Sequence, residues 1–180
     1  MKKNYLAFLI LFSFFSVQAQ EEDNQDSYEK KNDITLNTIA ALNKTLNISY
    51  ESHLNAKSSL GVYYFQVLTK NTSNDMNYSI SPYYRRYFGK KYASGFFVEG
   101  FGMFTSIDGK KIYTSEDHSK YTENPDVFDL ALGAGGGWKW ASKSGFLFEA
   151  NVGYGGLLFN ANKTDHTIVS KFGLSAGYRF

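Results

Sequence analysis

The sequence predicts an all-β protein, an eight-stranded antiparallel up-and-down transmembrane β-barrel. Apolar and polar residues alternate along most of the predicted strands, and short connections alternate with longer ones. Aromatic residues make up 18% of the chain, although its mean hydropathy is only −0.36. Half of each strand of a membrane barrel faces away from lipid, so such a protein is polar on average while its lipid face stays apolar.

The first 19 residues predict a cleaved secretory signal peptide. Lys2 and Lys3 precede an apolar run at 5–17, and the small-residue ending VQA marks the cleavage site. The run is shorter than the roughly 20 apolar residues of a membrane-spanning helix. The chain has no Cys, so neither a lipid-modified N-terminus nor a disulfide framework is expected. These features fit a periplasmic or outer-membrane destination, and together with the predicted barrel they predict export to the outer membrane of a Gram-negative-type cell.

The rest of the chain divides into a flexible periplasmic leader at 20–32, which is almost wholly polar, and a barrel at 33–180. Without Lys2 and Lys3, the Lys and Arg residues number 17 and equal the 17 Asp and Glu residues. A formally neutral mature chain gives no reason to expect nucleic acid as a partner.

Period-two alternation predicts the strands. We expect them near 33–42, 46–54, 58–69, 76–88, 95–107, 127–141, 145–158 and 169–180. In the last of these, one face carries Phe172, Leu174, Ala176, Tyr178 and Phe180, and the other carries Lys171, Gly173, Ser175, Gly177 and Arg179. In the last three strands we place Leu132, Val152 and Leu174 against lipid and Gly133, Asn151 and Ser175 toward the lumen.

The third and fifth strands alternate less cleanly. Aromatic residues fall on both faces there, at Tyr63, Tyr64, Phe65, Phe96 and Phe97. Aromatic residues near strand ends are typical of the two interfacial girdles of a membrane barrel, and we interpret these residues so.

Connection lengths support the same topology. The links at 55–57, 89–94 and 142–144 are short, and those at 70–75, 108–126 and 159–167 are longer. Outer-membrane barrels have short periplasmic turns and longer outer loops. The first outer link, at 43–45, is short and departs from the trend.

A soluble sandwich or lipocalin-like barrel is the structural alternative, because period two does not show which face is inside. The face that carries Gly, Ser and charges is too small and too polar to form a dry core. The final strand also ends on an aromatic residue. Both observations favour the membrane barrel.

The ending LSAGYRF at 174–180 resembles the C-terminal signal that the barrel assembly machinery recognises, with Tyr178 and Phe180 as its signal residues. The stretch 34–180 also resembles a bacterial domain-of-unknown-function family of small outer-membrane barrels. The likeness is carried by LNISYE at 46–51, ISPYYR at 80–85, GFFVEG at 95–100 and KSGFLFE at 143–149. The architecture is similar to the OmpA and OmpX class. None of these resemblances implies an activity.

The lumen of an eight-stranded barrel is just filled by side chains, so an open diffusion pore is not expected. The predicted inward face collects charges at Glu51, Arg85, Glu99, Lys139, Glu149, Lys171 and Arg179. Charges inside a lipid-wrapped barrel must be paired or hydrated. We expect a polar network of ion pairs that plugs the lumen; an ion or proton path is the alternative interpretation.

We predict no catalytic residues, no metal site and no cofactor. Small barrels that modify lipid A use a His with a Ser and an acidic residue. Here the possible sets are Asp117, His118 and Ser119 in the longest loop and Asp165 and His166 in the last one. Neither stretch shows the rigid scaffold that would hold a base beside its nucleophile, so we do not expect catalysis there. For the same reason we do not expect a metal site formed by His118 and His166. His53 faces inward near a short turn, and we interpret it as a girdle residue.

The predicted function is a non-enzymatic barrel with a structural or surface-interaction role. Its expected partners are outer-membrane lipid, the assembly machinery and an extracellular partner at the loop 108–126, whose length favours a functional or disordered segment. That loop suits an extended hairpin that presents an edge. The alternatives are a lipid-modifying outer-membrane enzyme and a soluble periplasmic barrel that binds a small ligand.

Overall fold

The computed structural model describes residues 30–69, 75–113 and 121–180. The predicted signal peptide and most of the predicted leader lie outside these residues. The elements are β1 (Asn32–Asn37), α2 (Thr38–Leu42), β2 (Thr45–Asn55), β3 (Ser58–Val67), β4 (Met76–Tyr87), β5 (Gly95–Ile107), β6 (Lys111–Tyr113), β7 (Tyr121–Glu123), β8 (Val127–Ala141), β9 (Phe146–Leu157), the 3-10 turn η2 (Ala161–Lys163) and β10 (Ile168–Arg179). Within this part of the chain, neither helical segment is long and apolar enough to cross a membrane.

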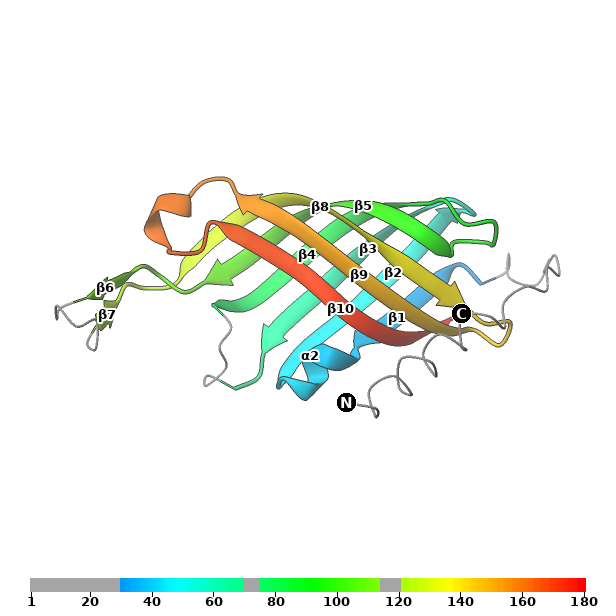
Figure 1. Ribbon diagram of the computed structural model, residues 1–180, viewed down its shortest axis with the longest axis horizontal. Coiled ribbons are helices and arrows are strands. Elements are labelled where there is room, and N and C mark those ends of the chain that lie inside the picture. Colours follow the sequence, from blue (N-terminus) through cyan, green and yellow to red (C-terminus); the bar gives the residue numbers. More distant parts are fainter. Residues whose placement is uncertain (1–29, 70–74, 114–120) are drawn as a thin grey trace, which may run out of the picture.

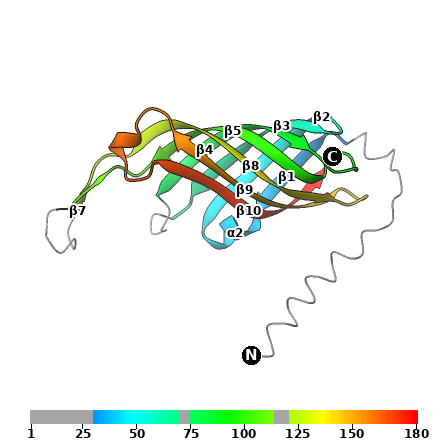
Figure 2. The same ribbon diagram turned by 45° about the horizontal axis from the view of Figure 1, so that its top comes forward.

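Eight strands close into an antiparallel up-and-down barrel, which confirms the predicted fold class. Each strand pairs with its neighbours in the chain, in the order β1-β10-β9-β8-β5-β4-β3-β2, and β1 pairs with both β2 and β10. The short strands β6 and β7 pair only with each other and project beyond the barrel (Figures 1 and 2). All strand edges of the barrel are therefore paired.

The two ends of the barrel differ. At one end, here named the turn end, the connections 56–57, 88–94 and 142–145 lie beside the start of β1 and the end of β10. At the other, the loop end, the connections run over 38–44, 68–75, 108–126 and 158–167. In Figure 1 the turn end lies on the right and the loop end on the left. Short and long connections thus alternate as predicted.

The prediction of a strand over 33–42 is wrong in its second half. The strand β1 stops at Asn37, whose side chain accepts a hydrogen bond from the backbone N–H of Ala40 at 3.1 Å and so caps α2. The following Ile39, Ala40, Ala41 and Leu42 include two alanines, the best helix former. The first outer connection therefore runs from 38 to 44 and is not an exception to the length pattern.

The two faces of the strands carry opposite chemistry, as predicted. Leu132, Val152 and Leu174 point outward and are about half exposed, at 57%, 49% and 53%. Ser175 is buried inside, and Asn151 also points inward. The other outward-facing large apolar side chains include Ile34, Leu36, Leu60, Val62, Ile80, Val98, Phe104, Phe128, Phe148 and Phe172. An apolar exterior surrounds a polar interior, the inverse of a soluble barrel.

Three of the aromatic residues interpreted as girdle residues are interior residues instead. Tyr63 and Phe97 are buried inside the barrel and Phe65 lines its cavity, whereas Phe96 faces outward at 47% exposure. The interior has room for large rings because glycines face them from neighbouring strands. A Cβ on Gly133 would lie 2.4 Å from the ring of Phe101, and a Cβ on Gly137 would lie 2.7 Å from the ring of Phe97. Glycine on one strand and an aromatic residue on another together fill the lumen.

Candidate functional site

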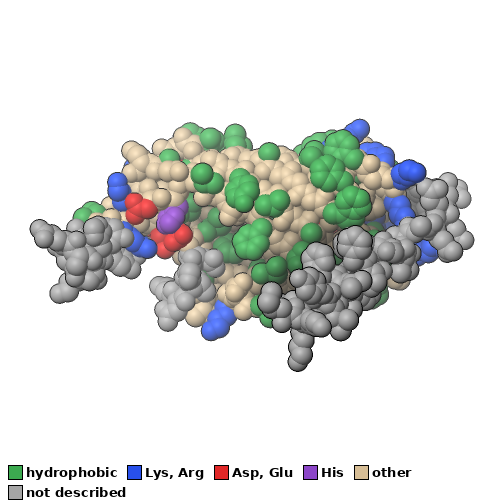
Figure 3. All heavy atoms as spheres, in the orientation of Figure 1, with side chains coloured by type: hydrophobic (Ala, Val, Ile, Leu, Met, Phe, Trp, Pro, Cys, Tyr) green, Lys and Arg blue, Asp and Glu red, His purple; other side chains and the backbone are tan. Residues whose placement is uncertain are grey.

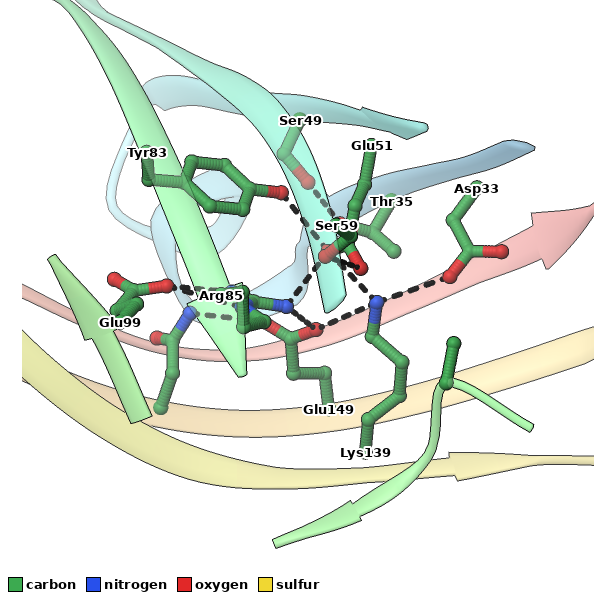
Figure 4. Close-up of polar contacts among 12 residues, drawn as sticks. Asp33, Thr35, Ser49, Glu51, Ser59, Tyr83, Arg85, Glu99, Lys139 and Glu149 are labelled. Carbon is green, nitrogen blue, oxygen red and sulfur yellow. Dashed lines mark hydrogen bonds and ion pairs between the residues drawn. The ribbon is translucent and has the colours of Figure 1, made fainter. Parts of the chain in front are cut away.

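A network of charged side chains lies inside the barrel and reaches its turn end through Arg179. Figure 4 shows the part of it around Arg85 and Lys139. Its members are four carboxylates and four cations, each at an inward position of its strand and each with a side chain at most 10% exposed. They are Asp33, Glu51, Glu99 and Glu149 with Arg85, Lys139, Lys171 and Arg179. All seven interior charges named from the sequence lie in this network, and Asp33 is the eighth member.

Arg85 of β4 lies at the centre of the network and is fully buried. Its Nη1 donates to Glu51 Oε2 and to Glu149 Oε2, each at 2.8 Å. Its Nη2 donates to Glu99 Oε2 at 2.8 Å and to the hydroxyl of Tyr63 at 2.8 Å. The planar guanidinium suits this role, because its five donors can serve several carboxylates at once.

Lys139 of β8 joins the central cluster to the turn end. Its Nζ lies 2.9 Å from Glu51 Oε2, 2.9 Å from Asp33 Oδ2 and 3.4 Å from Glu149 Oε2. Glu51 is thereby shared between Arg85 and Lys139. Removing either cation leaves Glu51 with the other as its neighbour.

Arg179 of β10 closes the network at the turn end. Its Nε and Nη2 donate to the two oxygens of Asp33 at 2.8 and 3.1 Å, a bidentate pair. Its remaining N–H groups donate to the backbone carbonyls of Tyr92 and Ala93 at 3.0 and 2.9 Å. A connection of the turn end is thus tied into the lumen.

The interpretation of His53 as a girdle residue is wrong. Its side chain is buried inside the barrel, where Nε2 lies 3.1 Å from Asp33 Oδ2 and the ring meets that of Tyr92 edge-on at 5.4 Å. Nδ1 of His53 is buried with no hydrogen-bond partner among the described residues. The inward direction was predicted correctly, but the ring is buried because Tyr92 of the connection 88–94 packs against it.

Lys171 of β10 lies at the edge of the network that faces the loop end. Its Nζ is 2.7 Å from Glu99 Oε1, and it lies over the rings of Tyr63 and Phe101, 3.8 and 4.4 Å from their centroids. Arg85 lies in the same way over the ring of Phe97, at 3.8 Å. Aromatic faces attract cations, so the interior rings stabilise the charges as well as filling space.

Hydroxyl groups satisfy the remaining carboxylate oxygens. Glu51 accepts from Ser59 at 2.8 Å, from Tyr83 at 3.0 Å and from Tyr87 at 2.5 Å. The tyrosine hydroxyl of residue 63 donates to Glu149 Oε1 at 3.1 Å. A buried network stabilises a fold only when its members are paired and hydrogen-bonded, and this one meets that condition.

Asp33, Glu51 and His53 offer ligand atoms within 4.8 Å of one another, the geometry of a metal site. Both carboxylates already contact Lys139 at 2.9 Å, and Asp33 also binds Arg179. A divalent cation would add positive charge beside Lys139 and Arg179, which already balance these carboxylates. The donor set therefore does not fit a metal ion.

Between the network and the loop end, a cavity of about 630 Å³ occupies the barrel. Tyr63, Asn151 and Lys171 line it where it meets the network, and Asn43 of the β1–β2 connection and His166 of the last loop line it at the loop end. Its wall combines apolar residues of one cluster, such as Met103 and Ile107, with serines and asparagines. We name this cavity the vestibule.

The loop end holds the other candidates. The pair of short strands in the loop 108–126 forms a hairpin, whose base is tied to the last loop by Lys110 N–H donating to Lys163 O at 3.0 Å. His166 Nε2 lies 3.3 Å from Asp75 Oδ1, and Asp165 accepts from the backbone N–H of Lys111. The set Asp117, His118 and Ser119 lies outside the described residues, and so does any site that would use His118.

The sequence interpretation missed Asp33 and the tyrosines at 63, 83 and 87. The signal for Asp33 was present, because Asp33, Thr35 and Asn37 alternate with Ile34 and Leu36 on the first strand. The tyrosines carried no such signal, since a period-two pattern with aromatic residues on both faces does not show which ring points inward.

The chain matches the family described as "Protein of unknown function (DUF3575)" over residues 5–179. No curated protein matches it. The barrel is similar to the crystal structure of the N-terminal β-barrel domain of Pseudomonas aeruginosa OprF, with a TM-score of 0.56 and 14% identity over 84% of this chain and 98% of that one. This likeness shows the fold.

The structure of the Yersinia pestis outer membrane protein Ail in a phospholipid bilayer nanodisc also matches, with a TM-score of 0.40 and 17% identity over 84% of this chain and 99% of that one.

Proposed function

The chain belongs to the DUF3575 family of proteins of unknown function, and from that premise we propose that it is a non-enzymatic, non-conducting outer-membrane barrel that holds its loops at the cell surface. In this proposal the turn end faces the periplasm and the loop end faces outward. The observation that carries it is the polarity of the barrel, with an apolar exterior around a charged, fully paired interior.

The exterior supports lipid as the surroundings of the barrel. Outward side chains such as Leu132, Val152 and Phe172 form a continuous apolar surface around a paired sheet. A soluble protein of this size does not expose an apolar surface of that extent. A soluble periplasmic barrel that binds a small ligand would need its large apolar residues inside, where this one has ion pairs.

The interior supports a role without conduction. The central guanidinium of Arg85, the ammonium of Lys139 and their carboxylate partners cross the lumen from several strands, and their side chains are 0–2% exposed. An ion crossing the barrel would have to separate several pairs in a low-dielectric environment, which costs several kcal/mol for each charge left unpaired. The vestibule therefore ends at the network.

Lipid acyl chemistry is not supported by the described residues. A hydroxyl nucleophile needs a base within hydrogen-bond reach. The ring of His166 contacts Asp75 and has no hydroxyl partner in the part of the chain that the structure describes. The surface role would then fall to the loop 108–126, whose hairpin offers an edge to an extracellular partner.

Membrane placement is tested by fractionation and by gel migration of the full chain. We expect the protein in the outer-membrane fraction, with unboiled and boiled samples migrating differently because a closed hydrogen-bonded barrel resists detergent. Equal migration together with a soluble periplasmic location would contradict the proposal.

Conduction is tested with the purified protein in a planar lipid bilayer, with a trimeric porin as the positive control. We expect no stable conductance steps. Reproducible ohmic steps from the wild-type barrel would show that the charged network leaves an aqueous path.

A further inference from the structure

The turn end carries cationic side chains and no Asp or Glu side chain among the described residues of its turns. Its Lys and Arg residues are Lys30, Lys31, Lys57, Arg86, Lys90, Lys91 and Lys143. At the loop end, by contrast, Lys44, Lys110, Lys111 and Lys163 lie among Asp75, Asp108, Asp126 and Asp165. Figure 3 shows the same difference: blue side chains gather at the right, and blue, red and purple ones lie together at the left.

Arg86 is the most informative member of this set. It is exposed on the outward face of β4 between the outward aromatic residues Tyr84 and Phe88, which are 46% and 61% exposed. Its neighbour Arg85 points the opposite way and meets three carboxylates. Within the described part of the chain, the side chain of Arg86 makes no ion pair or hydrogen bond.

A guanidinium among lipid-facing aromatic side chains near a strand end lies within reach of the phosphates of the lipid headgroups. Arg binds phosphate oxygens in a bidentate manner, and a long cationic side chain near a strand end reaches the headgroup level while its stem stays in apolar surroundings. Lys91, in the connection between β4 and β5, is also exposed and also makes no polar side-chain contact among the described residues.

We propose that Arg86 and Lys91 bind the headgroups of anionic phospholipids in the leaflet that faces the periplasm. The proposal rests on the membrane placement proposed above. The occupant is a phospholipid with net negative charge rather than a zwitterionic one, because neither Arg86 nor Lys91 contacts a carboxylate among the described residues.

The chain contains its own probe for this surface. Its two tryptophans, Trp138 and Trp140, lie near the end of β8 at the turn end. Trp138 is 56% exposed. Both it and Arg86 pair with residues of β5: Trp138 lies opposite Phe96, and Arg86 lies opposite Val98, two residues further along the strand. The strands β4 and β8 flank β5 and are therefore about 10 Å apart, so the indole and the guanidinium face neighbouring lipids of the same shell.

The experiment uses the full mature chain refolded into phosphatidylcholine vesicles. Acyl-brominated phosphatidylglycerol or acyl-brominated phosphatidylcholine replaces the host lipid in steps, and quenching of the tryptophans gives the relative association constant of the two lipids. One cation at an anionic membrane surface changes binding about fivefold. We expect the wild-type ratio to favour phosphatidylglycerol at least about fivefold at low salt, and to approach one in about 1 M salt, where the screening length is about 3 Å.

The double variant Arg86→Gln, Lys91→Gln should bring the low-salt ratio close to one. The matched control Lys110→Gln, Lys163→Gln removes the same charge at the loop end and should leave the ratio unchanged. A wild-type ratio of one, or an equal effect of both double variants, would overturn the proposal. The acidic residues Glu21, Glu22, Asp23, Asp26 and Glu29 are competing anions in the same chain, and if they occupy this surface the wild-type ratio is one.

Quenching by brominated phosphatidylcholine separates the two proposals. If that lipid quenches the tryptophans but the ratio is one, the barrel is in the bilayer and only the anionic lipid surface is refuted. If neither lipid quenches them, the membrane placement is wrong and the lipid surface is refuted with it.

Discussion

Replacing Arg85 with Met tests whether the charged interior holds the barrel together. The change removes the cation that contacts Glu51, Glu99 and Glu149 at 2.8 Å each. Breaking a buried ion pair by removing one partner costs about 3–5 kcal/mol, because the other charge stays buried. We expect the free energy of unfolding to fall by that amount.

The cost should concentrate at Glu149. Without Arg85, Glu99 keeps Lys171 at 2.7 Å and Glu51 keeps Lys139 at 2.9 Å, whereas Glu149 keeps only Lys139 at 3.4 Å as a cationic neighbour. The lumen then holds one more carboxylate than cations. Adding Glu149→Gln removes that excess charge and should recover about 0.5–3 kcal/mol of the loss, the usual range of coupling between contacting residues.

The adjacent residue provides the control. Arg86 occupies the next position of β4 but faces outward near the strand end, where Arg on a lipid face costs about 0–1 kcal/mol, so Arg86→Met should change stability by no more than that. Stability is measured by urea titration of the refolded protein, with tryptophan fluorescence and the unboiled gel band as independent readouts. The reasoning is refuted if Arg85→Met costs no more than Arg86→Met, or if Glu149→Gln worsens the Arg85 variant.

Three further predictions concern the two faces of the sheet and its assembly. Val152→Arg places a cation against lipid and should lower the free energy of unfolding by about 2–4 kcal/mol in a vesicle-folding titration. Ser79→Asn changes a residue that lines the vestibule and should lower it clearly less. If Ser79→Asn were the more damaging change, the assignment of the inward and outward faces would be wrong. Gly133→Ala places a Cβ 2.4 Å from an interior ring and should cost about 1–3 kcal/mol in the same titration, whereas Gly100→Ala, with nothing within 4 Å, should be close to neutral; equal effects would contradict the packing described above. Phe180→Ala should lower the amount of barrel in the outer-membrane fraction if the assembly machinery reads this outward residue, and an unchanged amount would count against that role.

The structure also changes one control that the sequence suggests. From period two alone, Asn151→Asp is a mild change of a lumenal polar residue. The amide of Asn151 donates to Glu149 Oε1 at 3.0 Å and to the hydroxyl of Tyr63 at 2.6 Å. An aspartate there would face the Glu149 carboxylate, and like charges at that distance repel. Ser79 replaces it as the inward control because it borders the vestibule.

Most of the fold was predictable because period-two alternation indicates the strands and their faces, and the connection lengths indicate how the strands follow one another. Strands such as β9 and β10 alternate along nearly their whole length, so their faces follow from the sequence. The helix α2 was not predictable in the same way. Ile39, Ala40, Ala41 and Leu42 do not alternate and include two good helix formers, but so short a segment does not identify a helix, and the capping contact of Asn37 shows where the chain turns.

The charged site was predictable in its members but not in its pairing. Each inward charge follows from its own strand, whereas the register between strands decides that Arg85 meets Glu99 directly across β4 and β5. Contacts such as that between Lys139 and Asp33, 106 residues apart, depend on how the barrel closes. The sequence pattern of a single strand does not show which residues of a distant strand its side chains will contact.

The bidentate pair between Asp33 and Arg179 has a consequence for how this barrel forms. The two residues are 146 positions apart, on β1 and β10, the first and last strands of the barrel, whose pairing closes the sheet. Until those edges meet, the guanidinium of Arg179 has no carboxylate partner in the network, and leaving it desolvated is unfavourable by several kcal/mol. Closure of the seam and drying of the lumen should therefore occur together as a late step. A foreign strand at the seam without an acid in register would leave Arg179 unpaired, so the lumen itself discriminates between correct and incorrect closure.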